Sequence, residues 1–192
     1  MLRMIVGFVA LAVVLGTAEA KGFYVGTYGG WNQDDVISHP WVEDNSGFAL
    51  GGVLGTSIDA VPGLRVEADV AFRQNEVDVF GGFLSVDHDT FTLMGNLVYD
   101  IPAKLGPVTP YVLAGVGYGS TQATFENVGL ASLEASGVAW QLGAGLTMPV
   151  ADGVTAGVGY RFTQVPEISV FGAELSDGSN HAVVAELRFS FN

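Results

Sequence analysis

The residues whose types could support catalysis are few and lie near the end of the chain. Asp177, Ser179 and His181 carry the groups of nucleophilic ester chemistry, in which a histidine takes the proton of a serine hydroxyl. Their alternating spacing does not by itself place the three side chains within hydrogen-bonding distance of one another. Segments rich in glycine and serine often produce such triplets by coincidence, so we expect no catalytic residues.

Residues for other ligand chemistry are also sparse. His39, His88 and His181 are isolated and there is no cysteine, so we expect surface histidines and no metal site. The glycines within residues 115–119 alternate along the chain and do not open a helix, so they do not form a phosphate-binding loop, and we expect no cofactor. A formal net charge of −13 disfavours nucleic acid as a partner.

Residues 1–20 have the composition of a cleavable export signal. Arg3 gives a positive start, residues 5–16 form an apolar core, and Ala18-Glu19-Ala20 is a small-x-small cleavage site. The apolar core is shorter than the ~18 to 20 residues that a membrane-spanning helix needs. We therefore expect cleavage between Ala20 and Lys21, which leaves residues 21–192 as a single exported domain.

Hydropathy alternates along eight segments of the exported chain. They span residues 22–31, 47–58, 64–75, 89–101, 109–119, 136–148, 154–164 and 181–191. Each segment is long enough to cross a membrane as a tilted strand of ~9 to 11 residues. Short links rich in proline and glycine, at 59–63, 102–108 and 149–153, alternate strictly with longer links at 32–46, 76–88, 120–135 and 165–180.

The two faces of each segment differ in polarity. In residues 64–75 the even-numbered positions are mainly apolar, whereas the odd-numbered positions include Arg65, Glu67, Asp69 and Arg73. A strand in lipid needs this apolar outer face and polar inner face, and an open sheet edge there would leave costly unpaired amides. The sequence therefore predicts an all-β fold, an eight-stranded antiparallel up-and-down transmembrane β-barrel in which the last segment pairs with the first.

The same parity predicts a polar network in the barrel lumen and aromatic girdles on its outside. The network consists of Arg65, Glu67, Asp69, Arg73, Arg161, Glu186 and Arg188. We expect it to act as a polar plug, with an ion pathway as the alternative. The girdles consist of Trp31, Phe48, Tyr118, Trp140 and Phe162 near the long links, and Phe23, Tyr99, Phe189 and Phe191 near the short links. A soluble sandwich that uses these aromatics as its core is the alternative.

Acidic residues concentrate in the long links, which contain no lysine or arginine. They are Asp34, Asp35, Glu43, Asp44, Glu76, Asp78, Asp87, Glu126, Glu134, Glu167, Glu174 and Asp177. A meander places all long links at one end and both termini with the short turns at the other. We expect the acidic loops to be extracellular and the termini periplasmic, as in outer-membrane barrels.

Four segments, in this order, resemble the OmpA/OmpX-like family of eight-stranded outer-membrane barrels. They are residues 22–31 (GFYVGTYGGW), 110–117 (PYVLAGVG), 157–162 (GVGYRF) and 187–191 (LRFSF). The resemblance implies a bacterial outer-membrane location, contacts with outer-membrane lipid and lipopolysaccharide, and recognition of residues 187–191 by the barrel-assembly machinery. Asn192 departs from the family, which usually ends on the aromatic residue. The peptidoglycan-binding domain of longer relatives has no counterpart here, so we do not expect cell-wall anchoring.

The function that these features favour is that of a structural and surface barrel. Its acidic loops would stabilise the envelope, hold divalent cations shared with lipopolysaccharide, or bind a surface ligand or host protein. Residues 76–87 predict a protruding hairpin whose tip carries the binding candidates Val79, Phe80 and Phe83. A narrow porin-like channel is the alternative, and a lipid A-modifying enzyme that uses His181 is a weaker one.

Overall fold

The computed structural model describes residues 22–34, 42–79, 84–103, 105–125, 133–166, 169–170, 173–174 and 178–191. The predicted leader and its cleavage site at Ala20 and Lys21 lie outside the described residues. The strands are β1 (Phe23–Asp34), β2 (Val42–Ser57), β3 (Leu64–Val79), β4 (Leu84–Asp100), β5 (Thr109–Phe125), β6 (Leu133–Ala151), β7 (Val154–Gln164), β8 (Ser169–Val170), β9 (Ala173–Glu174) and β10 (Ser179–Phe191). Among the described residues, no helix is long and apolar enough to cross a membrane.

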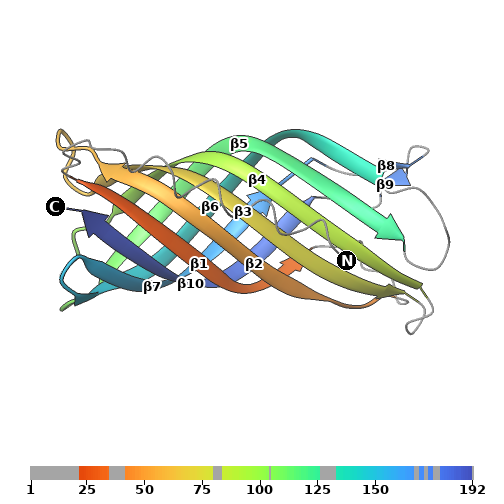
Figure 1. The fold of residues 1–192 in the computed structure, drawn as a ribbon, viewed down its shortest axis with the longest axis horizontal. Helices are drawn as coiled ribbons and strands as arrows, with labels where there is room; N and C mark the ends of the chain where they lie inside the picture. The colour runs from red at the N-terminus through yellow and green to blue at the C-terminus, as the bar shows by residue number, and fades with distance from the viewer. Residues whose placement is uncertain are drawn as a thin grey trace.

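Eight of these strands close into an antiparallel barrel, which confirms the predicted fold class. The strand order around the barrel is β1-β10-β7-β6-β5-β4-β3-β2, and the strands tilt strongly against its long axis (Figure 1). Closure is made by β1 and β10, which pair from Phe23 with Phe191 to Asp34 with Asn180. Each barrel strand therefore has a hydrogen-bonded neighbour on both sides over the central part of the wall.

The strands extend further toward the long-link end than the hydropathy pattern predicts. β2 begins at Val42, β3 and β4 remain paired as far as Val79 with Leu84, and β5 continues to Phe125. The predicted loops at 32–46, 76–88 and 120–135 are correspondingly too long. Alternation depends on one face being buried in lipid, so it disappears where a strand leaves the membrane although backbone pairing continues. The small β8–β9 hairpin within the last long link was not predicted either.

β7 ends earlier than its neighbour β6. Its last residue is Gln164, and Pro166 follows two positions later without a backbone N–H to continue the ladder. Val165 turns into the lumen, where it is buried with Met94 and Ala139 and donates its N–H to the carbonyl of Gly178 at 2.9 Å. Among the described residues, the first part of β6, numbers 133 to 139, therefore pairs with β5 alone.

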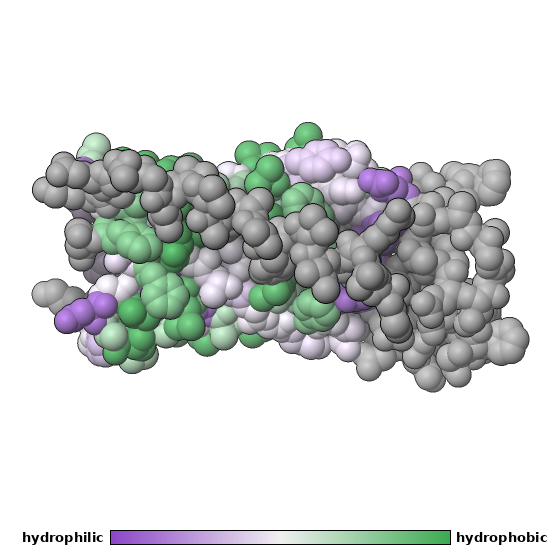
Figure 2. Space-filling model, in the orientation of Figure 1, coloured by the Kyte–Doolittle hydropathy of each residue, from purple (hydrophilic) through white to green (hydrophobic). Residues whose placement is uncertain are grey.

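The outer wall of the barrel is apolar. Exposed side chains include Leu93 and Leu97 on β4, Leu142 and Leu146 on β6, and Val183 on β10. Hydrophobic surface follows the barrel from near its turn end to its middle, and hydrophilic surface appears at the turn end and toward the loop end (Figure 2). On β4 the exposed apolar side chains run from Phe91 to Tyr99, which fits the ~9 to 11 residues that a tilted membrane strand needs.

Tyrosines fill the lumen where glycines face them across the sheet. A Cβ added to Gly51 would lie 2.2 Å from Cζ of Tyr28, and one added to Gly55 would lie 2.3 Å from Cζ of Tyr24. Tyr111 occupies the same kind of space over Gly145. An eight-stranded barrel has an interior only wide enough for side chains. Each of these large inward side chains therefore needs a glycine, which has no side chain, on the strand it faces.

Gly30 and Gly29 provide a matched test of this packing. A Cβ on inward-facing Gly30 would lie 1.9 Å from the carbonyl oxygen of Val183, a backbone atom of β10. A Cβ on its outward-facing neighbour Gly29 would meet only ordinary contacts at 3.4 Å or more. We expect Gly30→Ala to lower the free energy of unfolding by about 1–3 kcal/mol and Gly29→Ala to leave it nearly unchanged. Urea unfolding of the detergent-folded protein measures both, and equal effects would contradict the packing argument.

Candidate functional site

The candidate site is the lumen, where polar side chains of several strands meet. At the turn end, the Nε and Nη2 of Arg65 donate to the two carboxylate oxygens of Asp100, each at 2.9 Å. The Nη1 of Arg65 donates to Oε1 of Glu67 and to the hydroxyl of Tyr24, both at 2.6 Å, and Tyr24 donates to the same Glu67 oxygen at 2.7 Å. This cluster joins β1, β3 and β4, and every charged member has an opposite charge beside it.

A second cluster around Asp69 occupies the centre of the barrel. Its Oδ2 accepts hydrogen bonds from Nη1 of Arg161 at 2.5 Å and from Nδ2 of Asn96 at 3.3 Å, and its Oδ1 accepts one from the Tyr28 hydroxyl at 2.9 Å. The Arg161 guanidinium also lies 3.9 Å from the centre of the Tyr28 ring. Asn96 in turn accepts from Gln141 at 2.7 Å. Five strands, β1, β3, β4, β6 and β7, are thereby linked across the lumen.

Arg73 occupies the next level toward the loop end and has a different environment. Only 1% of it is exposed, and it donates to the hydroxyls of Thr92 at 3.1 Å and Thr163 at 3.0 Å. No carboxylate pairs with it among the described residues. The sequence pattern placed Arg73 with the other lumen charges, whereas its hydrogen-bond partners are neutral.

The level beyond Arg73 is built from amides. The Nδ2 of Asn32 donates to the side-chain oxygens of Asn75 and Asn180, both at 3.1 Å. All three asparagines are buried. Hydrogen bonds between amides therefore tie β1, β3 and β10 together here, without a formal charge.

His88 and Asp34 lie inside the barrel near its loop end, which corrects two expectations. The Nδ1 of His88 lies 2.7 Å from Oδ2 of Asp34, and both side chains are buried. We expected His88 at the surface and Asp34 in the acidic rim. Because β1 and β4 extend further than predicted, both residues fall on inward-facing strand positions. His39 lies outside the described residues.

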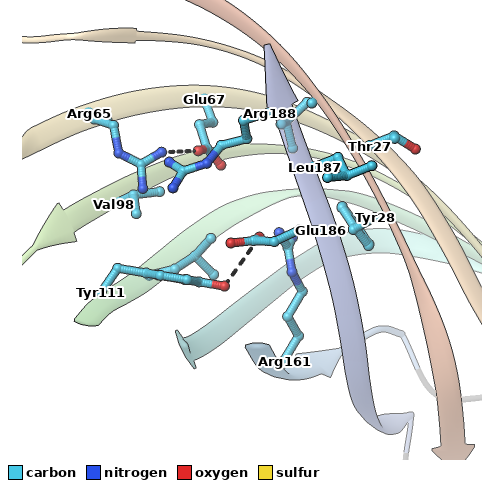
Figure 3. A pocket seen from close by; sticks show the side chains of 13 residues that line it. Thr27, Tyr28, Arg65, Glu67, Val98, Tyr111, Arg161, Glu186, Leu187 and Arg188 are labelled. Carbon is cyan, nitrogen blue, oxygen red and sulfur yellow. Dashed lines mark hydrogen bonds and ion pairs between the residues drawn. The ribbon is translucent and has the colours of Figure 1, made fainter. Parts of the chain in front are cut away.

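Glu186 and Arg188 are inward-facing but stand apart from the ion pairs. Glu186 accepts a hydrogen bond from the Tyr111 hydroxyl at 3.3 Å (Figure 3). The guanidinium of Arg188 lies 5.8 Å from the centre of the Tyr24 ring, and no hydrogen bond or ion pair of Arg188 occurs among the described residues. The predicted network of seven residues is therefore divided, since its ion pairs within the lumen are those of Arg65 with Glu67 and of Arg161 with Asp69.

Space inside the central lumen is very limited. The cavity lined by Tyr28, Tyr111, Arg161 and Glu186, among others, measures about 10 Å³, roughly the space needed for one water molecule. Figure 3 shows these side chains converging from different strands. At the loop end, Val165 and Pro166 lie over the positions of Gly119 and Gly137. At its middle the lumen is occupied by the protein's own side chains.

Several residues of these clusters were missed by the sequence analysis. They are Tyr24, Tyr28, Asn96, Asp100, Tyr111 and Gln141. On β1 both faces carry aromatic and small residues, so parity does not mark the tyrosines as inward. On β4 the inward positions include the apolar residues Met94 and Val98, so the inner face does not stand out as polar, and Asn96 and Asp100 were not recognised as lumen residues. Tyrosines facing glycines on the adjacent strand would have been the usable signal.

The residues predicted to form girdles point outward. All of them are exposed except Phe162, which is partly covered by Trp140, at 5.3 Å between ring centres, and by His181, at 5.1 Å. Trp31 lies opposite Phe48 on β2, and Phe23 lies opposite Phe191 on β10. The loop-end and turn-end aromatics therefore occupy opposite ends of the apolar band.

The candidate catalytic triplet lies partly on the outer face. The hydroxyl of Ser179 donates to Oε1 of Gln164 at 3.0 Å, and Nδ1 of His181 lies 2.5 Å from the Tyr160 hydroxyl. Asp177 lies outside the described residues. Phe80 and Phe83 of the predicted hairpin tip also lie outside them, whereas Val79 ends β3 and pairs with Leu84 and Val42.

Asp69 is the residue whose removal tests the central cluster most directly. Asp69→Asn leaves the buried Arg161 without its carboxylate, and we expect the free energy of unfolding to fall by about 3–5 kcal/mol. Asp152→Asn removes the same charge from an exposed turn and should change it by less than about 0.5 kcal/mol. Urea titrations of both detergent-folded variants measure the difference. Similar stabilities for the two would show that the central ion pair contributes little.

Comparison with solved structures gives several matches to outer-membrane barrels. Neisserial surface protein A (NspA) aligns at 17% identity with a TM-score of 0.67, covering 89% of this chain and 98% of that chain. A major outer membrane protein from Thermus thermophilus aligns at 14% identity with a TM-score of 0.60, covering 88% of this chain and 98% of that chain. Ail of Yersinia pestis, solved with the heparin analogue sucrose octasulfate, aligns at 15% identity with a TM-score of 0.53. The alignment covers 88% of this chain and 100% of that chain. At these identities the likeness shows a common fold.

Sequence comparisons complete the assignment. No curated protein matches this chain. Residues 4–191 match the family described as outer membrane protein beta-barrel domain. This match spans nearly the whole sequence, and the closed eight-stranded barrel with its apolar outer wall agrees with it. The chain therefore belongs to the outer membrane protein beta-barrel domain family.

Proposed function

We propose that this chain is a structural barrel of the bacterial outer membrane that its own side chains close to solutes. In this proposal residues 1–20 export the protein and are removed, the termini and short turns lie in the periplasm, and the long loops face outside. The barrel-assembly machinery inserts it, and its outer wall contacts lipid and lipopolysaccharide. Family membership supports the location, and the alternation of short and long links supports the orientation.

The filled lumen carries this proposal. The Asp69–Arg161 pair and its neighbours connect five strands across the centre, and the remaining cavity there measures about 10 Å³. A solute would have to displace buried ion pairs, and each separated partner would be left as an uncompensated charge. This cost favours a polar plug over the alternative of a narrow channel.

Planar-bilayer recording distinguishes the plug from the channel. We expect the wild-type protein, folded in detergent and checked by faster migration of the unboiled sample, to give no stepped conductance. Reproducible steps whose size changes in Arg161→Gln or Glu67→Gln would overturn the plug and establish a channel. The control is Asp152→Asn, whose altered charge lies in an exposed turn outside the lumen.

Surface binding is a second function that the protruding strands support. The predicted ribbon of β3 and β4 is not free, because β2 flanks β3 as far as Val42 and β5 flanks β4 as far as Phe125. The start of β6 is instead an open edge among the described residues, where Glu134 and Ser136 are exposed, and the start of β2 before Ser46 is another, since it pairs with β3 alone. A free strand edge can accept an extended segment of a partner protein by β-augmentation.

Acidic residues near the loops support envelope stabilisation through cations. No group of three or more His, Cys, Asp or Glu side chains that could hold a metal occurs among the described residues. In this proposal, lipopolysaccharide phosphates supply oxygen ligands to a divalent cation bound there. The lipid A-modifying activity has less support, because the Ser179 hydroxyl donates to Gln164 and the His181 ring lies against Tyr160 and Phe162.

Adhesion of bacteria that display the chain tests the two candidate binding surfaces. If the hairpin tip binds, replacing Val79, Phe80 and Phe83 with Ser should abolish adhesion to cultured cells. If the β6 edge binds, Ser136→Lys should abolish it, because an edge lysine blocks strand addition. Gln122→Lys is the matched control on β5, a strand paired on both sides at this level. Unchanged adhesion in both test variants, with heat-modifiable gel mobility intact, would exclude both surfaces.

A further inference from the structure

The turn end of the lumen differs from its filled centre. A cavity of about 400 Å³ opens there, and residues from all eight barrel strands line it. This turn-end vestibule is defined by Gly22, Tyr24, Ser57, Arg65, Asp100, Thr109, Thr147, Pro149, Thr155, Arg188 and Ser190. Its volume falls within the ~300–1,000 Å³ of small-molecule sites. Most of its lining residues carry a hydroxyl or a charged group, unlike those of the apolar outer wall of the same strands.

The vestibule contains two arginines, Arg65 and Arg188, and Arg188 is the one that forms no ion pair among the described residues. Arg65 uses its Nε, Nη1 and Nη2 on Asp100, Glu67 and Tyr24. Both oxygens of Asp100 are taken by Arg65, and Oε1 of Glu67 is shared by Arg65 and Tyr24. Arg188 lies over the Tyr24 ring and shares the central cavity lining with Glu67 and Glu186, but it forms no ion pair with either among the described residues, and its buried Nε has no hydrogen-bond partner there. Figure 3 shows its side chain reaching from β10 toward Arg65 and Glu67.

Hydroxyl groups surround the same guanidinium. Thr155 on β7 is the cross-strand partner of Arg188, and Ser190 lines the vestibule two residues further along β10. Cross-strand partners have Cβ atoms about 4.5–5.5 Å apart, so both side chains can reach one ligand. Neither hydroxyl has a side-chain hydrogen bond among the described residues. The side-chain hydrogen bonds of this region join Arg65, Tyr24, Glu67 and Asp100, and Thr147 donates to the carbonyl of Thr109.

We propose that the turn-end vestibule binds a small oxyanion, a phosphate or a carboxylate group, between Arg188, Thr155 and Ser190. A guanidinium presents several N–H donors in a fixed fork that matches two oxygens of such a group. The hydroxyls supply further donors to the remaining oxygen atoms. An anion here would also balance a positive charge for which the described part of the chain provides no ion-pair partner.

NMR titration of the full chain folded in micelles tests the site. Sodium phosphate is added against sodium chloride of equal ionic strength, and sodium acetate is titrated separately. We expect saturable shifts of the amides of Thr155, Arg188 and Ser190, while Asn32 and Thr90 at the other end do not move. Phosphate alone, acetate alone or both can saturate the site, which identifies the group it takes. Failure of both to saturate it, or equal shifts with chloride, would overturn the proposal.

Variants locate the binding group. Arg188→Gln should weaken binding about tenfold or more, because it removes a charged hydrogen-bonding partner. Arg188→Lys keeps the charge without the fork and should retain part of the affinity. If Arg188→Gln does not fold, Thr155→Val supplies the test with an expected severalfold loss, and Thr121→Val is its matched control at the loop end. Wild-type affinity in Arg188→Gln, or in Thr155→Val where that variant supplies the test, would overturn the assignment.

Discussion

Backbone hydrogen bonding without water is the constraint on which the rest of this structure depends. In hydrocarbon every amide needs a partner within the protein, and a sheet meets this need only when its last strand returns to its first. In this chain the last strand of the barrel, β10, pairs with the first, β1, along their full common length and so closes the sheet. Eight strands then fix the diameter, and the diameter leaves room for side chains alone. The Tyr–Gly contacts, the paired charges and the small central cavity all follow from this narrow tube.

The lumen divides into two regions of different chemistry. Toward the turns, arginines and carboxylates form ion pairs around Arg65 and Asp69. Toward the loops, Arg73 is surrounded by threonine hydroxyls and the Asn32 cluster is neutral, and the carboxylate of Asp34 meets the His88 ring in place of an arginine. Ion pairs stabilise the folded state more strongly where water is excluded, but the loss of one partner there also destabilises it more. The turn half is therefore the part of the wall in which substitutions interact most strongly with one another.

Sequence reasoning predicted the strands where lipid imposes a pattern and was wrong where lipid is absent. On β3 the alternation of Leu64, Arg65, Val66 and Glu67 has one physical cause, the contrast between hydrocarbon and lumen, and the predicted faces agree with the structure. Beyond the membrane the outer face no longer needs apolar residues, so the ends of β2 to β5 and the buried position of His88 carried no such signal. Contacts between strands distant in the sequence, such as Arg65 with Asp100, depend on register and side-chain reach. One sequence does not specify either quantity.

Pro166 stops β7 while β6 continues, and this short interruption makes the upper wall asymmetric. A tube with a level rim would present the same profile from every side. Here the wall formed by β2 to β6 stands higher than the side formed by β1, β7 and β10. The molecule is consequently asymmetric when viewed from its loop end, although all eight strands pair on both sides in its central part. Neighbours in a crowded membrane would meet different shapes depending on the direction from which they approach.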